Sequence, residues 1–278
     1  MAGARHGRSE LTVFDFIHIT DLHILPAGET NYGLDPAERL RMAVESIAAH
    51  HGPDSVTPAE FVIVTGDLTH HGQPEAYAQL RDILKGLPMP FHLMLGNHDE
   101  RDHFRAAFPG QPVDENGFVQ QALETDVGLF ILLDTKAPGT HAGELCAQRL
   151  GWLAARLAES QGSVFLFLHH PPMPVGIAWM DRIQMQDAAA LAAVLAPHQG
   201  RIRHMFHGHL HRPLAGSWMD IPFSSLRGTA HQVALDLSER DLAPGSHEPA
   251  AYALVRVSPD AVIVHSHDYL DQTGSFDL

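Results

Sequence analysis

The sequence predicts an α/β fold with a strand-rich C-terminal part. From Phe14 to about His209, short apolar runs rich in β-branched residues alternate with helical patterns, which is typical of α/β domains. Residues 214–278 show strand patterns without clear helices. The 278 residues contain no internal repeat and no long linker. We therefore expect one domain over residues 11–278, preceded by a disordered leader at residues 1–10.

The expected strands of the alternating part are short apolar runs bounded by polar residues. They are Phe14–Thr20, Phe61–Thr65, Phe91–Leu95, Val127–Leu133, Ser163–Leu168 and Arg203–Phe206. Four C-terminal segments also have strand character: Gly216–Phe223, His231–Leu237, Ala251–Ser258 and Ala261–His267. The last two are candidates for a hairpin. The C-terminal strands are expected to extend a second sheet or a sheet edge, where they could pair between subunits.

Four helices are expected between these strands, over residues 35–50, 74–85, 147–160 and 187–196. The first helix has the clearest start. Asp35 suits the N-cap, Pro36 suits the first helical position, and Glu38 completes a capping-box pattern. The second helix begins at Pro74 and ends before Gly86. Helices therefore alternate with strands through most of the chain.

Charge and composition argue against several classes of function. The formal net charge of −15 argues against a broad surface for long nucleic acid or anionic membranes. No apolar run is long enough to cross a bilayer, and no signal-like apolar core is present, so we expect a cytoplasmic protein without membrane insertion. The only cysteine, Cys146, excludes an internal disulfide framework and any multi-cysteine zinc site. Histidine is unusually abundant, with 22 residues against 18 Lys and Arg together.

Polar residues that can bind metals follow five of the expected strands directly. They are Asp21 and His23 in TDLH, Asp67 in TGDLTHHG, Asn97, His98 and Asp99 in LGNHDE, His169 and His170 in LHHPP, and His207, His209 and His211 in FHGHLHRP. Because ligand sites of α/β sheets lie at the carboxyl ends of the strands, we expect these segments to converge. The last three histidines stand at alternate positions, so an extended backbone would point them the same way.

This set of side chains suits two neighbouring divalent metal ions. Carboxylate, imidazole and amide oxygen ligands together fit Mn²⁺, Fe or Zn²⁺, and a single ion would leave ligands over. Asp67 is the natural bridging ligand, because it follows a central strand between the two sets of candidate metal ligands. Read alone, each motif is a common turn or helix cap. Only the whole set favours a metal centre.

Most other histidines are expected to be ordinary surface or core residues. They are His6, His50, His51, His198, His231, His247, His265 and His267. Trp179 and Met180 lie in the loop 171–182, close to His169 in the sequence. An apolar segment at that place is either a pocket wall or lid, or a hydrophobic interface.

Together the motifs resemble those of the calcineurin-like metallophosphoesterase superfamily. They are D-x-H at Asp21 and His23, GD at 66–67, GNHD at 96–99, the later His169, and GHxH at 208–211. This set spans most of the chain. The segments LHHPPMPVGIAWMD and GDLTHHGQPEAY are most similar to the branch that holds class III cyclic-nucleotide phosphodiesterases and bacterial glycerophosphodiesterases. The resemblance implies a four-layer αββα sandwich with mixed sheets.

The resemblance also implies roles for individual residues. One metal would be bound by Asp21, His23, Asp67 and His209, and the other by Asp67, Asn97, His169 and His207. His98 would act on the phosphate or the leaving oxygen, and Asp99 would orient its ring. Further substrate contacts are expected from Asn97, His70, His71 and His211. His70 stands where related sequences often carry an acidic or amide residue, which leaves substrate preference open there.

The expected activity is hydrolysis of small phosphodiesters by a hydroxide held between two metals. The first candidate substrates are 3',5'-cyclic nucleotides, and glycerophosphodiesters are the second. A phosphomonoesterase or a nuclease would use the same metal pair, although the negative charge argues against long nucleic acid. From a different class, a non-catalytic metal-dependent binding module would be expected to lose a ligand or His98, and both are present. The resemblance also favours a homo-oligomer.

Overall fold

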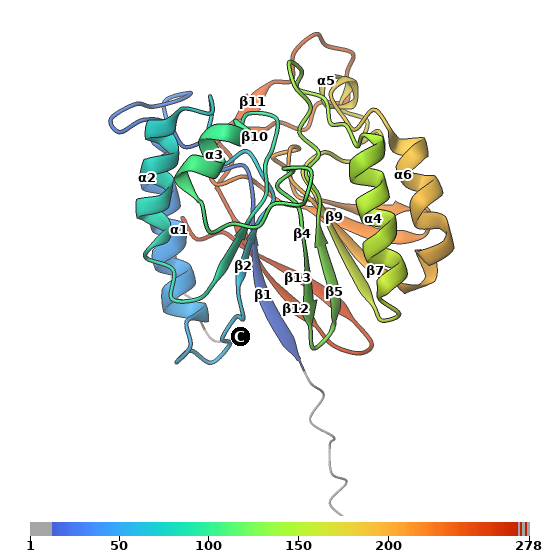
Figure 1. Cartoon of the computed structure of the whole chain (residues 1–278). Coiled ribbons are helices and arrows are strands. Elements are labelled where there is room, and N and C mark those ends of the chain that lie inside the picture. Colours follow the sequence, from blue (N-terminus) through green and yellow to red (C-terminus); the bar gives the residue numbers. More distant parts are fainter. Residues whose placement is uncertain (1–12, 272, 274–275, 277–278) are drawn as a thin grey trace, which may run out of the picture.

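Two β-sheets pack face to face between two layers of helices (Figure 1). The structure is a computed structural model that describes residues 13–271, 273 and 276. The expected leader at residues 1–10 lies outside the described residues. The α/β class and the four-layer αββα arrangement with mixed sheets are confirmed.

The first sheet has five strands in the order β13-β12-β1-β2-β3. Its strands are β1 (Phe14–Ile19), β2 (Val62–Val64), β3 (Phe91–Leu93), β12 (Tyr252–Val257) and β13 (Val262–His267). β1, β2 and β3 run parallel, whereas β12 and β13 form an antiparallel hairpin that pairs with β1. The predicted C-terminal hairpin is confirmed, and it extends the first sheet.

The second sheet has six strands in the order β4-β5-β6-β7-β9-β8. Its strands are β4 (Gln121–Thr125), β5 (Gly128–Leu132), β6 (Val164–Leu168), β7 (Ile202–His207), β8 (Leu214–Trp218) and β9 (Ile221–Ser225). β5, β6, β7 and β9 run parallel between antiparallel edge strands. The segments that follow the parallel strands of both sheets therefore gather at one end of the sandwich.

Helices cover the outer face of each sheet. α1 (Pro36–His51), α2 (Pro74–Leu84) and α3 (Arg101–Ala107) pack on the first sheet, and α4 (Ala147–Glu159) and α6 (Ala188–Leu195) pack on the second. The remaining elements are α5 (Ala178–Arg182), the 3₁₀ helix η1 (Ala196–Arg201), and the two-stranded ribbon of β10 (Gln232–Val233) and β11 (Gly245–Ser246). None of the helices in the described residues is both long and apolar enough to cross a bilayer.

Aromatic rings fill the layer between the two sheets. The Phe16 ring of β1 lies with its centroid 5.3 Å from Phe130, 5.9 Å from Phe167 and 5.6 Å from Phe206 of the second sheet. All four residues are fully buried. Edge-to-face rings at such distances combine large apolar burial with a preferred geometry. This packing holds the two sheets in one relative position and so brings their strand ends together.

The start of α1 follows the predicted pattern only in part. The Asp35 carboxylate accepts hydrogen bonds from the backbone N–H groups of Ala37 at 2.9 Å and Glu38 at 3.0 Å, as an N-cap does. The Glu38 carboxylate lies 3.4 Å from the Arg41 guanidinium on the exposed side of the helix. The ion pair at this spacing thus takes the place of the second hydrogen bond of a capping box.

The C-terminal part differs from the prediction in two places. The predicted strand Gly216–Phe223 is a hairpin of β8 and β9, because Met219 and Asp220 have φ values of 52° and 58° and reverse the chain. Of the predicted strand His231–Leu237, only Gln232 and Val233 pair as a strand. The short helices α3 and α5 are also absent from the prediction, since seven and five residues are too few to show a helical period.

Candidate metal centre

Several donor side chains lie on strained backbone just beyond the strand ends. Asp21, His23, Asp67, His209 and His211 have φ values of 53°, 46°, 48°, 68° and 48°. They are five of the eight non-glycine residues with positive φ among the described residues. Such conformations cost on the order of 1–3 kcal/mol each, and they cluster at functional sites. The strain therefore marks this end of the sandwich as the candidate site.

A first ligand group consists of Asp21, His23, Asp67 and His211, whose ligand atoms lie within 4.8 Å of one another. His23 Nε2 is 3.5 Å from Asp67 Oδ2, and His211 Nε2 is 3.4 Å from Asp21 Oδ1. The two Nε2 atoms are 3.1 Å apart. All four residues are buried. Two carboxylates and two imidazoles that converge in this way form a donor set for a divalent ion.

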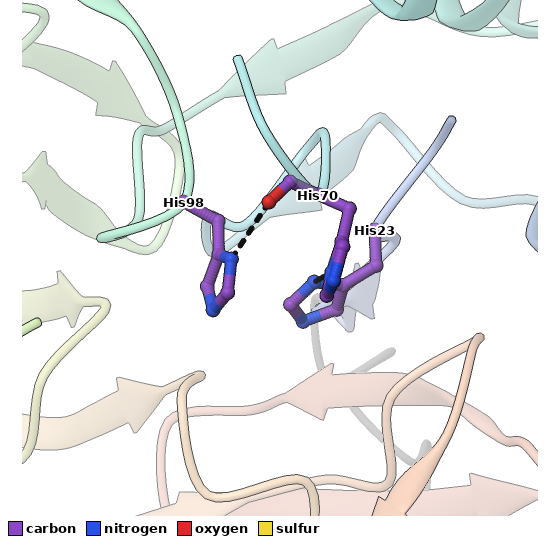
Figure 2. Close-up of side chains that lie close together, drawn as sticks. All are labelled: His23, His70 and His98. Carbon is purple, nitrogen blue, oxygen red and sulfur yellow. Dashed lines mark hydrogen bonds between the residues drawn. The ribbon is translucent and has the colours of Figure 1, made fainter. Parts of the chain in front are cut away.

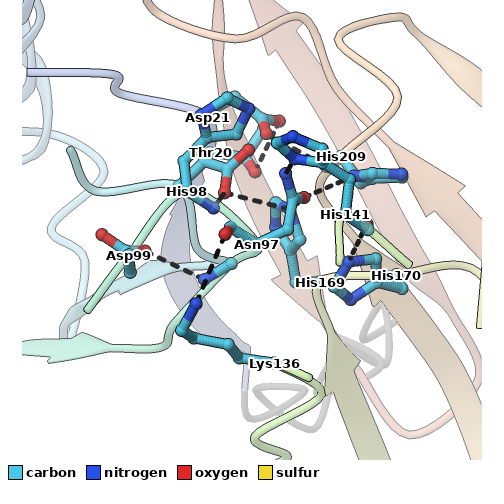
Figure 3. Close-up of polar contacts among 12 residues, drawn as sticks. Thr20, Asp21, Asn97, His98, Asp99, Lys136, His141, His169, His170 and His209 are labelled. Carbon is cyan, nitrogen blue, oxygen red and sulfur yellow. Dashed lines mark hydrogen bonds and ion pairs between the residues drawn. The ribbon is translucent and has the colours of Figure 1, made fainter. Parts of the chain in front are cut away.

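A second ligand group consists of Asp67, Asn97, His169 and His209, of which Figure 3 labels the last three. Asp67 Oδ1 is 3.4 Å from His169 Nε2, and Asn97 Oδ1 is 3.1 Å from the same nitrogen. Asn97 Oδ1 is also 2.9 Å from His209 Nδ1. Gly96 permits this close packing, because a methyl group there would overlap the Asp67 carboxylate. Asp67 therefore directs one carboxylate oxygen to each group.

Backbone carbonyls orient two of the imidazole rings. His169 Nδ1 lies 2.7 Å from the Thr65 carbonyl, and His211 Nδ1 lies 2.8 Å from the His231 carbonyl. When each Nδ1–H donates to its carbonyl, the lone pair remains on Nε2, which faces the carboxylates. His170 differs, because Thr135 Oγ1 contacts its Nδ1 at 2.8 Å and the His141 carbonyl contacts its Nε2 at 3.1 Å. Of the twin histidines, His169 is thus the one free to bind an ion.

Of the predicted ligand pair His207 and His209, the structure brings only His209 into a ligand group. His207 is the last residue of β7 and lies outside both ligand groups. Its two buried ring nitrogens have no hydrogen-bond partner among the described residues, and its ring packs 5.8 Å from Phe223. The family resemblance supplied that pair, although the histidines of the GHxH motif at 208–211 stand at 209 and 211, and the positive φ values of these two residues turn the chain away from the strand direction. His209 lies in the second group, and His211 takes the place in the first group that was predicted for His209.

The protonation behaviour of the site fits binding of cations. Burial alone would raise the pKa of Asp67, but the nearby His169 and His98 outweigh it and hold that pKa well below its usual range. Burial lowers the pKa of His169, yet Asp67 and Asp21 outweigh it and raise the value to about 9. A metal ion bound at Nε2 would therefore displace a proton from this ring. Burial lowers the pKa of His23 and His209 well below their usual value, so both rings are neutral and offer lone pairs. His209 Nε2 is buried without a hydrogen-bond partner among the described residues.

His98 lies beside the ligand groups, but Asp99 does not orient it. His98 Nδ1 is 2.8 Å from the His70 carbonyl. The fully buried Asp99 carboxylate accepts hydrogen bonds from the N–H groups of Leu68 and Gly96 and from the Tyr77 hydroxyl, at 2.9 to 3.0 Å. Asp99 therefore ties the loop after β3 to the loop after β2. The predicted catalytic role of Asp99 is corrected to a structural one, because the turn sends adjacent side chains in opposite directions.

His70 lies at the cavity as predicted, whereas His71 does not. His70 Nδ1 is 3.0 Å from His23 Nδ1, and the His70 ring stacks on His98 with centroids 5.0 Å apart (Figure 2). His70 thus contacts the proposed metal ligand His23 and also lines the cavity at this end of the sandwich. His71 is exposed and is not part of the cavity lining, so the expected substrate contact from His71 is not supported.

Members of both ligand groups line a cavity of about 590 Å³, which is in the range of small-molecule sites, roughly 300–1,000 Å³. Two residues that sequence reasoning missed also line it. His231 packs 4.9 Å from His23 and 4.5 Å from His211 between ring centroids. His141 Nδ1 lies 2.9 Å from Asn97 Nδ2. The sequence signal that could have found His231 is its position after β9, which ends at Ser225. The loop that follows this strand lies at the same end of the sandwich as the other ligand segments.

Comparisons with known proteins agree with this geometry. The sequence profile of calcineurin-like phosphoesterases matches residues 14–213. A probable cyclic nucleotide phosphodiesterase of Rhodopseudomonas palustris is 43% identical over 267 residues, which is 95% of each chain. A probable glycerophosphodiester phosphodiesterase of Arcobacter nitrofigilis is 30% identical over 240 residues, which is 86% of each chain.

The fold has counterparts among solved structures. A dimetal phosphatase from Danio rerio superposes with a TM-score of 0.70 over 93% of this chain and 97% of that chain. Its identity is 17%, so this likeness concerns the fold alone. The profile match covers most of the chain, and the relatives match over nearly its whole length. The chain therefore belongs to the calcineurin-like phosphoesterase family, whose domain is hydrolytic.

Proposed function

We propose that this protein hydrolyses small phosphodiesters at a centre of two divalent metal ions, with 3',5'-cyclic nucleotides as the first candidate substrates. The observation that carries the proposal is the position of Asp67, which lines the cavity and directs Oδ2 to His23 and Oδ1 to His169. A carboxylate shared in this way suits a pair of adjacent ions. The relative from Rhodopseudomonas palustris, named a probable cyclic nucleotide phosphodiesterase, supports the substrate.

The proposed metal ligands follow from the two groups. Asp21, His23, Asp67 and His211 would hold the first ion, and Asp67, Asn97, His169 and His209 would hold the second. The donors accept Mn²⁺, Fe or Zn²⁺. When bound, such ions polarise phosphate oxygens and lower the pKa of a water molecule, which supplies the nucleophile that no side chain provides.

His98 is the proposed general acid. Because its Nδ1–H donates to the His70 carbonyl, its Nε2 remains available at the cavity, which His98 lines. In the hydrolysis, a water molecule loses one proton to the solvent, its oxygen bonds to phosphorus, and the bond from phosphorus to the leaving oxygen breaks. As an imidazolium, His98 gives its Nε2 proton to that leaving oxygen. Asn97 keeps its amide oxygen on the side of His169 and His209 because His141 contacts the amide nitrogen.

Turnover by the metal-reconstituted protein tests the proposal. Cyclic AMP, a glycerophosphodiester, an aryl phosphodiester and an aryl phosphomonoester are compared with Mn²⁺, Fe or Zn²⁺, and an Asn97→Ala variant is the control. We expect cyclic AMP hydrolysis far above that of the monoester, and its loss in the variant. The glycerophosphodiester is the second candidate because of the relative from Arcobacter nitrofigilis. If the protein binds two metals and cleaves none of these substrates, the proposal fails in favour of a metal-dependent binding module.

Replacing His207 and His211 separately tests which of them binds a metal ion. We expect His211→Leu to lose the first metal, because this ring nitrogen lies 3.4 Å from Asp21 Oδ1. His207→Leu should keep both metals, since its buried ring nitrogens have no partner among the described residues and a leucine of similar size removes that polar burial. The metal content of each purified variant is measured by elemental analysis. Loss of metal from His207→Leu with two metals retained by His211→Leu would restore the sequence-based pair.

Three further expectations remain predictions. They are a homo-oligomeric state, a cytoplasmic location, and binding of small phosphodiesters but not of long nucleic acid. The exposed position of Ile263 on the edge strand β13 is consistent with pairing between subunits. Turnover of a small substrate should depend only weakly on salt, unlike binding of a long nucleic acid.

A further inference from the structure

One end of the cavity has an apolar wall. Its residues come from α5 and from the ribbon of β10 and β11 with its loop, which lie together at the top of Figure 1. They are Trp179, Met180, Ile183, Val233, Leu242 and Ala243. Met180 and Val233 pack in one buried cluster with Leu210, the neighbour of both His209 and His211. The wall is thus attached directly to the metal centre.

Contacts outside the cavity hold the wall in place. The Arg182 guanidinium lies 5.2 Å from the centroid of the Trp179 ring, a cation–π distance. Arg182 also donates hydrogen bonds to the carbonyls of Arg240 at 2.7 Å and Asp241 at 3.1 Å, which joins α5 to the loop of the ribbon. The Asp181 carboxylate accepts from the N–H of Val175 at 2.7 Å. The wall is therefore preformed, so a ligand need not order it on binding.

Two polar side chains near the wall are engaged with the protein itself. The Gln232 side chain donates to the Gly228 carbonyl at 2.8 Å and accepts from the Gly228 N–H at 2.9 Å. His247 Nε2 lies 2.9 Å from the Tyr32 carbonyl. The wall consequently offers apolar surface rather than directed hydrogen bonds. A ligand that fills the whole cavity needs an anionic phosphodiester at one end and a flat apolar body at the other.

We propose that the wall is a subsite for the purine base of a cyclic nucleotide, with Trp179 as its main contact. This inference rests on the proposed function and decides between its two candidate substrates. A purine offers a planar face to the wall, whereas a glycerol group offers only hydroxyls. Because the contact is apolar, adenine and guanine are both accepted. A site that reads a base by hydrogen bonds rejects a wrong group by roughly 10⁴-fold, and an apolar site discriminates far less.

The test uses two kinds of probe to distinguish binding at the wall from binding at the metal ligands. KM is measured for cyclic AMP and cyclic GMP, and the inhibition constant is measured for inorganic phosphate, which reports on the metal end. We expect Trp179→Ala to raise both KM values roughly tenfold or more, as loss of base–aromatic stacking does, and to leave the inhibition constant for inorganic phosphate unchanged. Trp179→Phe keeps a ring and should recover most of the affinity.

Trp152→Ala is the matched control, because Trp152 also lies beside an arginine, with Arg156 at 5.8 Å, but stands on α4 away from the cavity. Equal KM values for cyclic AMP in the two alanine variants would overturn the subsite. So would a parallel change in phosphate inhibition, or a wild-type preference between the two cyclic nucleotides above about 100-fold. If the wild-type protein cleaves glycerophosphodiesters but neither cyclic nucleotide, both the cyclic-nucleotide substrate and the base subsite are wrong. The proposed phosphodiesterase activity would still stand.

Discussion

Replacing Asp67 by asparagine is expected to abolish the metal centre and lower turnover by roughly 10³-fold or more. The substitution keeps the size of the side chain but removes the charge between His23 and His169, which lie 3.5 Å and 3.4 Å from its two oxygens. Both ions lose an anionic ligand at once. Metal content by elemental analysis and initial rates on cyclic AMP measure the two effects.

An aspartate outside the site provides the control. Asp35 caps α1 through hydrogen bonds to Ala37 and Glu38, and asparagine is an equally good N-cap. Asp35→Asn should therefore keep two metals and full turnover. If Asp67→Asn also retained two metals and more than a tenth of the wild-type rate, Asp67 could not be the shared ligand.

Asp134→Ala is expected to cause the largest loss of stability, about 3–5 kcal/mol in the free energy of unfolding. Asp134 is fully buried at the end of β5 and accepts two hydrogen bonds from Arg101, at 2.8 and 2.9 Å. It also accepts from the N–H groups of Val119 and Lys136, both at 3.0 Å. The nearly buried Arg149 lies 3.9 Å away. Alanine would leave the Arg101 guanidinium without its counterion and two backbone N–H groups without their acceptor.

Urea unfolding followed by circular dichroism measures this loss. Asp82→Ala is the control, since Asp82 pairs with Lys85 on the exposed surface of α2 at 2.6 Å. Exposed pairs contribute little to stability, so the unfolding midpoint of this variant should match wild type. A midpoint for Asp134→Ala equal to that of Asp82→Ala would show that the buried network does not stabilise the fold.

Most of the fold could be predicted because its signals are local. The β6 run is apolar over its whole length, and β1 is buried at every position although it includes Asp15 and His18, as expected for strands covered on both faces. Asp35 and Pro36 mark the start of α1 within a few residues. The hairpin of β8 and β9 escaped prediction because its reversal rests on Met219 and Asp220 at positive φ, and methionine gives no turn signal.

The candidate site could be predicted as a set of segments but not as two ligand groups. Asp, His and Asn after successive strands are visible in the sequence, and the strand ends do converge. Which of His207, His209 and His211 points inward depends on backbone dihedral angles beyond β7. Likewise, Asp99 turns to the loop after β2 rather than to the neighbouring His98 ring.

By itself, the sequence determined the α/β class, the family resemblance and the segments that carry metal-binding side chains, because these depend on residue type and short-range spacing. Only the tertiary structure decided that His211 rather than His207 lies in a ligand group, that His231 and His141 line the cavity, and that Trp179 forms part of its wall. The physical reason is that these contacts join residues from both sheets. Their geometry is set by the aromatic packing between the sheets and by strained turns at the strand ends.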